Sequence, residues 1–317
     1  MTMPTRTRIR SIVAAVAVAS ALLAAGCGSD GGGSSSSPSA ARLPGSGKPP
    51  ITLGTKNFTE QFVLGQLYKQ ALEAKGFTVV LKQDVGASEI IDRALESGRI
   101  DMYMEYIGVI AQELARTGRH LKTRGETLRT ATAFERGRGF ELLEIAPGAD
   151  SDANVVRLDY ARRHHLKSTA DLKGVGTFRY GGPAENRTRF QGAVGMRRVY
   201  GLTNLRYVPV AIDRRYQALD DGTIDVAAGF STEGQLLDKA KYLVLTDPKG
   251  IFGFQNIAPV ISGKLLARLG PQFTTTVNAV SAKLTDQALR EMNAAVDLRG
   301  QQPADVAARF LQQSGLK

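Results

Sequence analysis

The sequence predicts an α/β protein built from two similar lobes. The main observation is an internal repeat, because residues 94–101 (ALESGRID) return as residues 218–225 (ALDDGTID). In each copy a helix ends, a Gly follows, and a strand opens with Ile-Asp. The flanks also correspond: residues 75–77 match 200–202, and the loop 54–58 matches 178–182. Two similar lobes predict a cleft between them, where small ligands bind.

Short β-rich runs bounded by turn residues predict the strands. We expect strands at residues 51–54, 78–82, 100–103, 154–157, 176–180, 207–210, 225–229, 242–246 and 257–261. The run at 154–157 is expected to cross into the second lobe, and the run at 257–261 to cross back. The first lobe is then built from both ends of the chain, and two crossings form a two-strand hinge.

Capping residues and glycines predict the helices. Thr59 is expected to cap a helix that runs to about residue 75, and Ser88 to cap a helix that ends at Gly98. Further helices are expected at residues 108–116, 134–142, from 169, at 190–200, 214–219, 281–296 and 303–312. Asp101 and Asp225 recur in the repeat, and we interpret them as structural residues that bind backbone N–H groups.

The N-terminus predicts export and a lipid anchor. Three arginines within the first ten residues precede an apolar stretch, residues 12–25, that is too short for a comfortable membrane span. The stretch ends in Leu-Ala-Ala-Gly before Cys27, which is similar to a bacterial lipobox, although Leu usually stands three residues before the Cys, where this chain has Ala24. Lipidation of Cys27 is therefore expected; an ordinary secretory signal with an incidental Cys is the alternative.

Residues 28–38 (GSDGGGSSSSP) have the composition of a flexible tether. We divide the chain into a signal peptide (1–26), a tether (27–49), a first lobe (50–150 and 256–317) and a second lobe (151–255). The expected location is extracytoplasmic, with the protein anchored to the cell membrane through Cys27. Since Cys27 is the only cysteine, no disulfide framework is expected.

Composition and motifs argue against several functions. The chain has a net charge of +11; without the three signal-peptide arginines, 38 of the 41 basic residues remain against 30 acidic ones, a net charge of +8. The basic residues are scattered, so no nucleic-acid groove is expected. No Gly-x-Ser-x-Gly elbow, phosphate-binding loop or His-Glu-x-x-His is present. We expect no catalytic residue, no metal and no cofactor.

Three segments are expected at the carboxyl ends of strands, where ligands of α/β lobes bind. They are residues 55–61, 103–108 and 229–234. Helix N-termini there offer free N–H donors. An aromatic wall is expected from Phe58, Tyr103, Tyr106 and Phe230.

These segments resemble the osmoprotectant (glycine betaine/carnitine/choline) substrate-binding proteins of ABC transporters. The resemblance rests, in order and spacing, on residues 54–61 (GTKNFTEQ), 98–108 (GRIDMYMEYIG), 215–219 (RYQAL), 230–234 (FSTEG) and 257–260 (IAPV). It implies a two-lobed periplasmic-binding-protein fold, type II-like, without catalysis. It also implies delivery of a small ligand to a membrane permease with its ATPase; we expect the binding protein to be a monomer.

The family holds a quaternary ammonium in a cage of tyrosines by cation–π attraction. Tyr106 matches one cage position and Phe230 stands at a second, while Asp152 and Gln255 fall at two others. The pocket has then lost two aromatic walls and gained a carboxylate and an amide. The expected ligand-binding residues are Asn57, Phe58, Thr59, Gln61, Ser88, Tyr106, Asp152, Phe230, Ser231, Thr232, Gln255 and Asn256.

Other functions stay open from the sequence. A polyol, a sugar or an aromatic compound could replace the quaternary amine in the same transport role. An exported hydrolase could use Glu60, Glu105 and Asp152, although no nucleophile–base pair supports it. A surface adhesion or scaffold protein is a third reading, in which bulky side chains would close the cleft.

Overall fold

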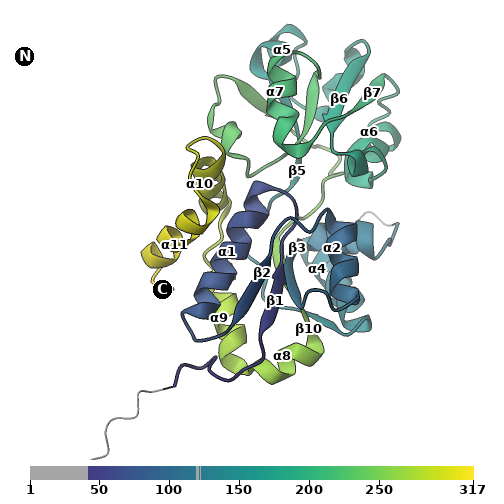
Figure 1. Ribbon diagram of the computed structural model, residues 1–317. Coiled ribbons are helices and arrows are strands. Elements are labelled where there is room, and N and C mark those ends of the chain that lie inside the picture. The colour runs from purple at the N-terminus through teal and green to yellow at the C-terminus, as the bar shows by residue number, and fades with distance from the viewer. Residues whose placement is uncertain (1–41, 119–120, 122) are drawn as a thin grey trace, which may run out of the picture. The chain divides into compact units, whose positions relative to one another are not determined.

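The computed structural model describes residues 42–118, 121 and 123–317; the predicted signal peptide, most of the tether and Cys27 lie outside the described residues. The described chain forms two α/β lobes, each around a mixed five-stranded sheet (Figure 1). The fold class predicted from the repeat is confirmed. No helix in the described part has the length and apolar character needed to span a bilayer.

The first sheet has the strand order β2-β1-β3-β10-β4. Its strands are β1 (Ile51–Gly54), β2 (Val79–Lys82), β3 (Met102–Tyr106), β4 (Phe140–Leu142) and β10 (Ile257–Ser262). β1 pairs in parallel with β2 and β3, whereas β10 is antiparallel to β3 and β4. The strand that returns from the second lobe is therefore built into the middle of the first sheet.

The second sheet has the order β7-β6-β8-β5-β9, which repeats the pattern of the first. Its strands are β5 (Asp152–Arg157), β6 (Phe178–Gly182), β7 (Leu205–Pro209), β8 (Val226–Phe230) and β9 (Tyr242–Leu245). Here β5, the strand that enters from the first lobe, is antiparallel to β8 and β9. Each lobe thus receives one antiparallel strand from a crossing of the chain.

Helices cover both faces of the first sheet. On one face α1 (Thr59–Glu73) packs against α9 (Pro271–Ser281) and α11 (Pro303–Gln313), with Leu64, Leu67 and Phe273 in the core. The other face is covered by α2 (Ser88–Glu96), α3 (Ile107–Val109), the π-helix η1 (Ile110–Leu114) and α4 (Arg124–Gly137). α8 (Gly263–Leu269) follows β10.

The second lobe carries shorter helices. They are α5 (Leu158–Arg163), η2 (Thr169–Gly174), η3 (Ala184–Arg187), η4 (Phe190–Val194), α6 (Gly195–Arg198), η5 (Ile212–Arg214), α7 (Arg215–Asp220) and η6 (Gly234–Leu237). α10 (Asp286–Asp297) differs from its neighbours, because it packs on α1 of the first lobe and also on η6 of the second. In Figure 1 it stands beside α1 at the level where the two lobes meet.

The repeat has a structural explanation. The Asp101 carboxylate accepts a 2.8 Å hydrogen bond from the Thr52 N–H, and the Asp225 carboxylate accepts a 2.7 Å bond from the Arg179 N–H. Each Asp therefore ties the start of one strand to its neighbour. Both residues are structural, as predicted. A close contact between a Gly and an Ile also repeats. A Cβ on Gly54 would lie 2.7 Å from the Ile100 side chain, and a Cβ on Gly181 would lie 2.6 Å from the Ile224 side chain.

The structure corrects several local predictions. The loop 54–58 does not correspond to residues 178–182; by strand register, Gly54 corresponds to Gly181. The predicted helix at 134–142 is wrong, because α4 ends at Gly137 and Phe140 begins β4, which pairs with β10. The expected helix at 190–200 is a π-turn followed by the short α6.

The two predicted caps are also wrong. Thr59 and Ser88 are the first residues of α1 and α2, and the residues that precede them, Phe58 and Ala87, take the cap positions without a side-chain hydrogen bond. The Thr59 hydroxyl instead donates to Asp297 at 2.6 Å. The Ser88 hydroxyl accepts a 3.3 Å bond from Lys56. Both side chains are thus drawn toward the lobe junction rather than toward their own helices.

Candidate binding site between the lobes

The carboxyl ends of β1, β3 and β8 converge with the start of β5 on a small cavity of about 40 Å³. Its walls are Lys56, Asn57, Phe58, Ala87, Ser88, Tyr106, Val109, Asp150, Asp152, Pro183, Glu185, Asn186, Arg189, Ile212, Phe230 and Gln255. Seven of the twelve predicted ligand-binding residues are among them. The cavity lies where two α/β sheets present their strand ends to one another, which is the usual place for a ligand.

Aromatic rings form one wall of the cavity. Phe58 stacks on Phe230 with ring centroids 5.2 Å apart and on Tyr106 with centroids 6.5 Å apart. Phe58 thus contacts two other rings of the expected aromatic wall. Tyr103 does not join the wall, since it is fully buried on the opposite face of β3 with Ile91 and Ile107. Strand alternation separates Tyr103 from Tyr106.

Lys56 lines the cavity, although it was not among the predicted ligand-binding residues. It is 4% exposed, and its Nζ lies 4.2 Å from the centroid of the Tyr106 ring and 5.6 Å from that of Phe58. The same ammonium forms an ion pair with the buried Glu105. A cation of the chain itself therefore occupies a face of the predicted cage tyrosine. Its position in the loop directly after β1, at the carboxyl end of the strand, was the available signal.

Charged groups of both signs complete the cavity. Burial raises the pKa of Asp152 to about 6, and the nearby Arg189 works against that shift. No hydrogen bond within the described part of the chain engages the Asp152 carboxylate. Arg189, also missed from the sequence, reaches across from the second lobe and donates two hydrogen bonds, 3.2 and 2.7 Å long, to Glu89 of α2. The cavity thus offers an aromatic face, three carboxyl groups (Asp150, Asp152 and Glu185) and two cations.

Five predicted residues lie outside the small cavity. Gln61 donates to the Tyr106 hydroxyl at 3.2 Å, and Asn256 donates to the carbonyls of Ala146 and Pro147 in the crossing segment. The Ser231 hydroxyl accepts from the Ser151 N–H at 3.0 Å. These three position other parts of the junction. Gln255, inside the cavity wall, has its amide bound to Val109 N–H and the Phe252 carbonyl.

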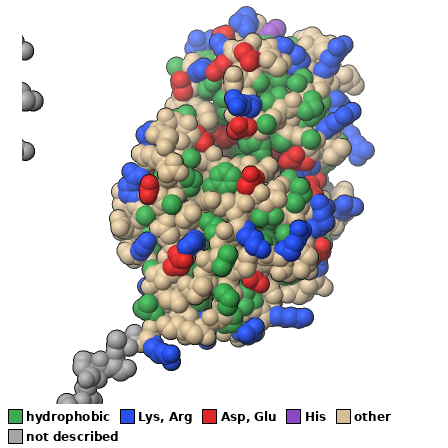
Figure 2. Space-filling model, in the orientation of Figure 1, with side chains coloured by type: hydrophobic (Ala, Val, Ile, Leu, Met, Phe, Trp, Pro, Cys, Tyr) green, Lys and Arg blue, Asp and Glu red, His purple; other side chains and the backbone are tan. Residues whose placement is uncertain are grey.

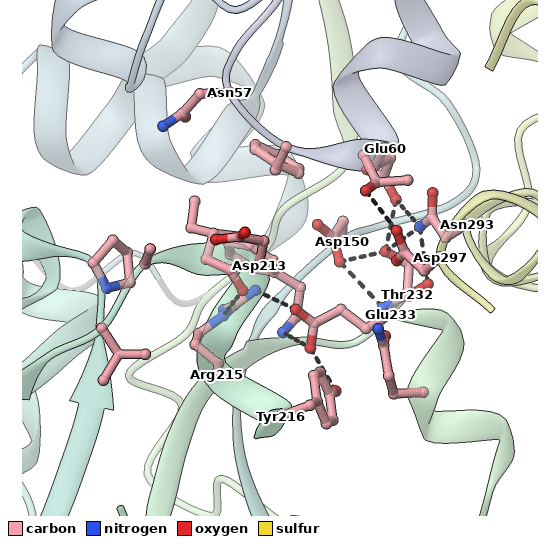
Figure 3. Close-up of a pocket in the computed structure, with 18 of the residues that line it drawn as sticks. Asn57, Glu60, Asp150, Asp213, Arg215, Tyr216, Thr232, Glu233, Asn293 and Asp297 are labelled. Carbon is pink, nitrogen blue, oxygen red and sulfur yellow. Dashed lines mark hydrogen bonds and ion pairs between the residues drawn. The ribbon is translucent and has the colours of Figure 1, made fainter. Parts of the chain in front are cut away.

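The remaining two, Thr59 and Thr232, line a larger pocket of about 900 Å³ beside the cavity. Asn57, Phe58, Asp150, Pro183, Ile212 and Phe230 belong to both. Six carboxyl-bearing residues line this pocket, and Figure 3 labels five of them: Glu60, Asp150, Asp213, Glu233 and Asp297. Figure 2 shows acidic side chains across the middle of the drawn face, with Lys and Arg mostly on its outer parts.

One buried cation supports the large pocket from behind. Arg215 is 1% exposed and forms an ion pair with Glu233, whose other oxygen accepts from the Tyr216 hydroxyl at 2.6 Å. Its guanidinium lies 4.7 Å from the centre of the Phe230 ring. Arg215 also donates to the carbonyls of Ile212 and Ala228. It fixes Phe230 and the loop after β8 in place.

Two of the three carboxylates named for a hydrolase, Glu60 and Glu105, are engaged with other side chains. Glu60 accepts from the Tyr106 hydroxyl at 2.7 Å, and Glu105 is paired with Lys56. Among the described residues, no group of three or more His, Cys, Asp or Glu side chains is arranged to hold a metal ion. The geometry therefore favours binding.

Two lobes of the same strand order with a polar and aromatic cavity between them define a two-lobed solute-binding protein. Residues 49–313 match the family described as the substrate binding domain of ABC-type glycine betaine transport systems, and the chain belongs to that family. The resemblance seen in the sequence is confirmed. The protein is thus a substrate-binding component of an ABC importer, which is a transport component and not an enzyme.

Several known proteins are similar over most of the chain. The glycine betaine-binding protein YehZ of Escherichia coli is 27% identical, covering 87% of this chain and 94% of its own. A glycine-betaine-binding protein of Pseudomonas aeruginosa is 28% identical, covering 84% and 88%. The solved structure of apo YehZ is 26% identical with a TM-score of 0.62, covering 84% of this chain and 99% of that one. A glycine betaine/carnitine/choline ABC transporter structure, 23% identical with the same coverage and a TM-score of 0.69, shares the fold.

Proposed function

We propose that this protein captures a small zwitterion that carries a quaternary amine, of the glycine betaine type, between its lobes and delivers it to an ABC permease. The observation that supports the proposal is the small cavity itself, which combines an aromatic wall with charges of both signs. The relatives bear names that specify glycine betaine and carnitine. A quaternary ammonium has no N–H to donate, so its recognition depends on aromatic faces and a nearby negative charge.

The charges of the cavity divide the ligand into two ends. Asp152, without a hydrogen-bond partner in the described chain, attracts the ammonium end toward Phe58 and Phe230. Lys56 and Arg189 attract a carboxylate. A ligand with both ends satisfies the cavity better than a simple cation, because a simple cation would meet two like charges at close range.

Titration calorimetry with glycine betaine, carnitine, choline and a set of sugars tests this function. We expect the two zwitterions to bind most tightly. Phe230→Ala and Phe58→Ala should each weaken binding by about 0.5–2 kcal/mol per lost aromatic contact. Tyr160→Ala, in the second lobe and outside the cavity, is the matched control. Unchanged affinity in both cavity variants would show that the ligand binds elsewhere.

A polar ligand without a quaternary amine is the second candidate. The free carboxylate of Asp152 favours it, since a hydroxyl or N–H group could donate to that oxygen. If a sugar or aromatic compound binds and no quaternary amine binds below millimolar concentration, the transport role stands with this second class of ligand.

We further propose that a lipid on Cys27 holds the protein at the outer face of the cell membrane, with the hinge of the crossing segments allowing the lobes to close. The support is the sequence pattern before and after Cys27. Cys27→Ala should release the protein from membranes or block its maturation. Membrane retention and lipid labelling that persist in this variant would refute the anchor.

A further inference from the structure

Two buried carboxyl groups meet a single hydroxyl where the lobes touch. Glu60 lies at the start of α1 in the first lobe, Asp150 lies in the crossing segment before β5, and Thr232 follows β8 in the second lobe. The Thr232 Oγ1 is 2.6 Å from Glu60 Oε2 and 2.5 Å from Asp150 Oδ1. The three residues are only 3%, 4% and 1% exposed. Figure 3 shows the three side chains pointing toward one another beside the large pocket.

Counting hydrogens shows that this cluster holds a proton. A hydroxyl has one hydrogen and can donate to only one of the two carboxyl groups. The other oxygen contact, which is equally short, needs a hydrogen of its own, and a carboxylic acid is the group that can supply it. The neighbouring donors do not supply that hydrogen. Tyr106 donates to Glu60 Oε1 at 2.7 Å and the Thr232 N–H to Asp150 Oδ1 at 3.1 Å, while Asn293 donates to Glu60 Oε2 at 3.1 Å and lies 3.4 Å from Thr232 Oγ1.

The electrostatic surroundings favour the same conclusion. Burial raises the pKa of Glu60 and raises that of Asp150 well above its ordinary range, the latter helped by the charge of Glu60 itself. Lys56 is the cation that lowers the pKa of Glu60, but Glu105 already pairs with it.

The other facing groups do not neutralise the pair. From the loop after β8, Glu233 adds a further negative charge near Asp150, and that charge is paired with Arg215 of α7. From α10, Arg290 donates to the Ser231 carbonyl at 3.0 Å. Asp297, at the end of the same helix, accepts from the Thr59 hydroxyl.

We propose that closing the lobes takes up one proton, which Glu60 and Asp150 hold between them through the Thr232 hydroxyl. When the lobes part, Thr232 leaves Glu60, and the carboxyl groups return to water and to their ordinary titration near pH 4. The proton is then a second ligand of the closed form and is coupled to the transported ligand. The inference rests on the proposed function only in assuming that ligand binding closes the lobes.

The sign of the coupling follows from the protonation states. Between about pH 4 and the raised pKa of the closed form, the closed form binds one more proton than the open form. Ligand affinity therefore falls as the pH rises through that window, by at most tenfold per pH unit for one proton. Release of the ligand is therefore favoured at higher pH.

Calorimetric titration with glycine betaine, in buffers of different ionisation enthalpy from pH 5 to 8, measures the proton uptake directly. Asp150→Asn should lower the uptake by up to one proton and flatten the pH dependence, whereas Asp297→Asn, another carboxyl of the large pocket, should behave as the wild type. Any proton uptake by Asp152 is the same in the wild type and in Asp150→Asn, so it cancels in the comparison. Equal uptake in the wild type and in Asp150→Asn would overturn the proposal.

A ligand-free measurement separates this proposal from the ligand class. The radius of gyration of the ligand-free wild type in small-angle scattering should increase as the pH rises from 5 to 8, because the proton binds the closed form and favours it at low pH. Asp150→Asn should remove that slope. Thr232→Val should reduce it and Thr232→Ser should restore it. If glycine betaine does not bind, the ligand class fails, while equal slopes in the wild type and Asp150→Asn would refute the shared proton.

Discussion

Substitution of Gly234 tests how the lobes meet. Gly234 begins η6 in the second lobe and lies against α10. A Cβ at this position would be 2.5 Å from the Cα, 2.7 Å from the N and 2.9 Å from the Cβ of Ala294. Two of these atoms are helix backbone and cannot turn aside as the end of a flexible side chain can. We therefore expect Gly234→Ala to push the second lobe away from α10.

The size of the effect follows from the cost of overpacking, about 1–3 kcal/mol for an added methyl-sized group. α10 also packs on α1 and α11, so it should stay with the first lobe when the lobes separate. The strain is then relieved in the open form. The substitution should therefore make the free energy of ligand binding less favourable and leave the free energy of unfolding of the open form unchanged. Such a cost weakens the dissociation constant by about 5- to 150-fold.

Calorimetric titration of the tightest-binding ligand, with small-angle scattering of the ligand-bound protein, measures both consequences. Gly234→Ala should bind more weakly and show a larger radius of gyration at equal ligand concentration. Gly176→Ala is the matched control, since a Cβ there meets nothing within 4 Å. Wild-type affinity and radius in Gly234→Ala would refute the assignment of this contact to the closed form.

Three further outcomes are expected. Arg215→Met leaves Glu233 buried without its cation and should lower the free energy of unfolding by about 3–5 kcal/mol; adding Glu233→Gln should recover part of it in urea titrations, and no recovery would contradict the pairing. Asp101→Ala removes the acceptor of the Thr52 N–H and should cost about 1–3 kcal/mol of stability without changing ligand affinity. The pKa of Asp152, raised to about 6 by burial, predicts that affinity for a cationic ligand falls as the pH drops through 6; a pH profile identical to that of Asp152→Asn would exclude this role.

The repeat made most of the fold predictable, because its information is local. The Gly that follows the helix and the Asp at the start of the next strand lie within eight residues of sequence. Asp101 and Asp225 accept the same kind of backbone hydrogen bond, one in each lobe. The element at residues 140–142 was missed for the opposite reason. Its strand character comes from pairing with β10, more than one hundred residues away, and its own composition continues the helical pattern of α4.

The sequence predicted the aromatic residues that line the site, but it did not predict the two cations. Residues 57–58 and Tyr106 follow from strand ends, which local pattern places. Arg189 meets Glu89 across one hundred residues, and no local signal pairs them. Lys56 stands next to Asn57, which was predicted, yet the direction of the Lys56 side chain depends on Glu105 in another strand.

The position of Lys56 bears on which ligands the cleft can hold. Its ammonium lies 4.2 Å from the centre of the Tyr106 ring, so a second cation cannot use that face without meeting a like charge. Phe58 and Phe230, stacked at 5.2 Å, are the rings that a ligand cation can use, with Asp152 beside them. A carboxylate on the ligand turns Lys56 from a competitor into a partner. This arrangement explains why we expect glycine betaine to bind more tightly than choline, which carries the same ammonium and no carboxylate.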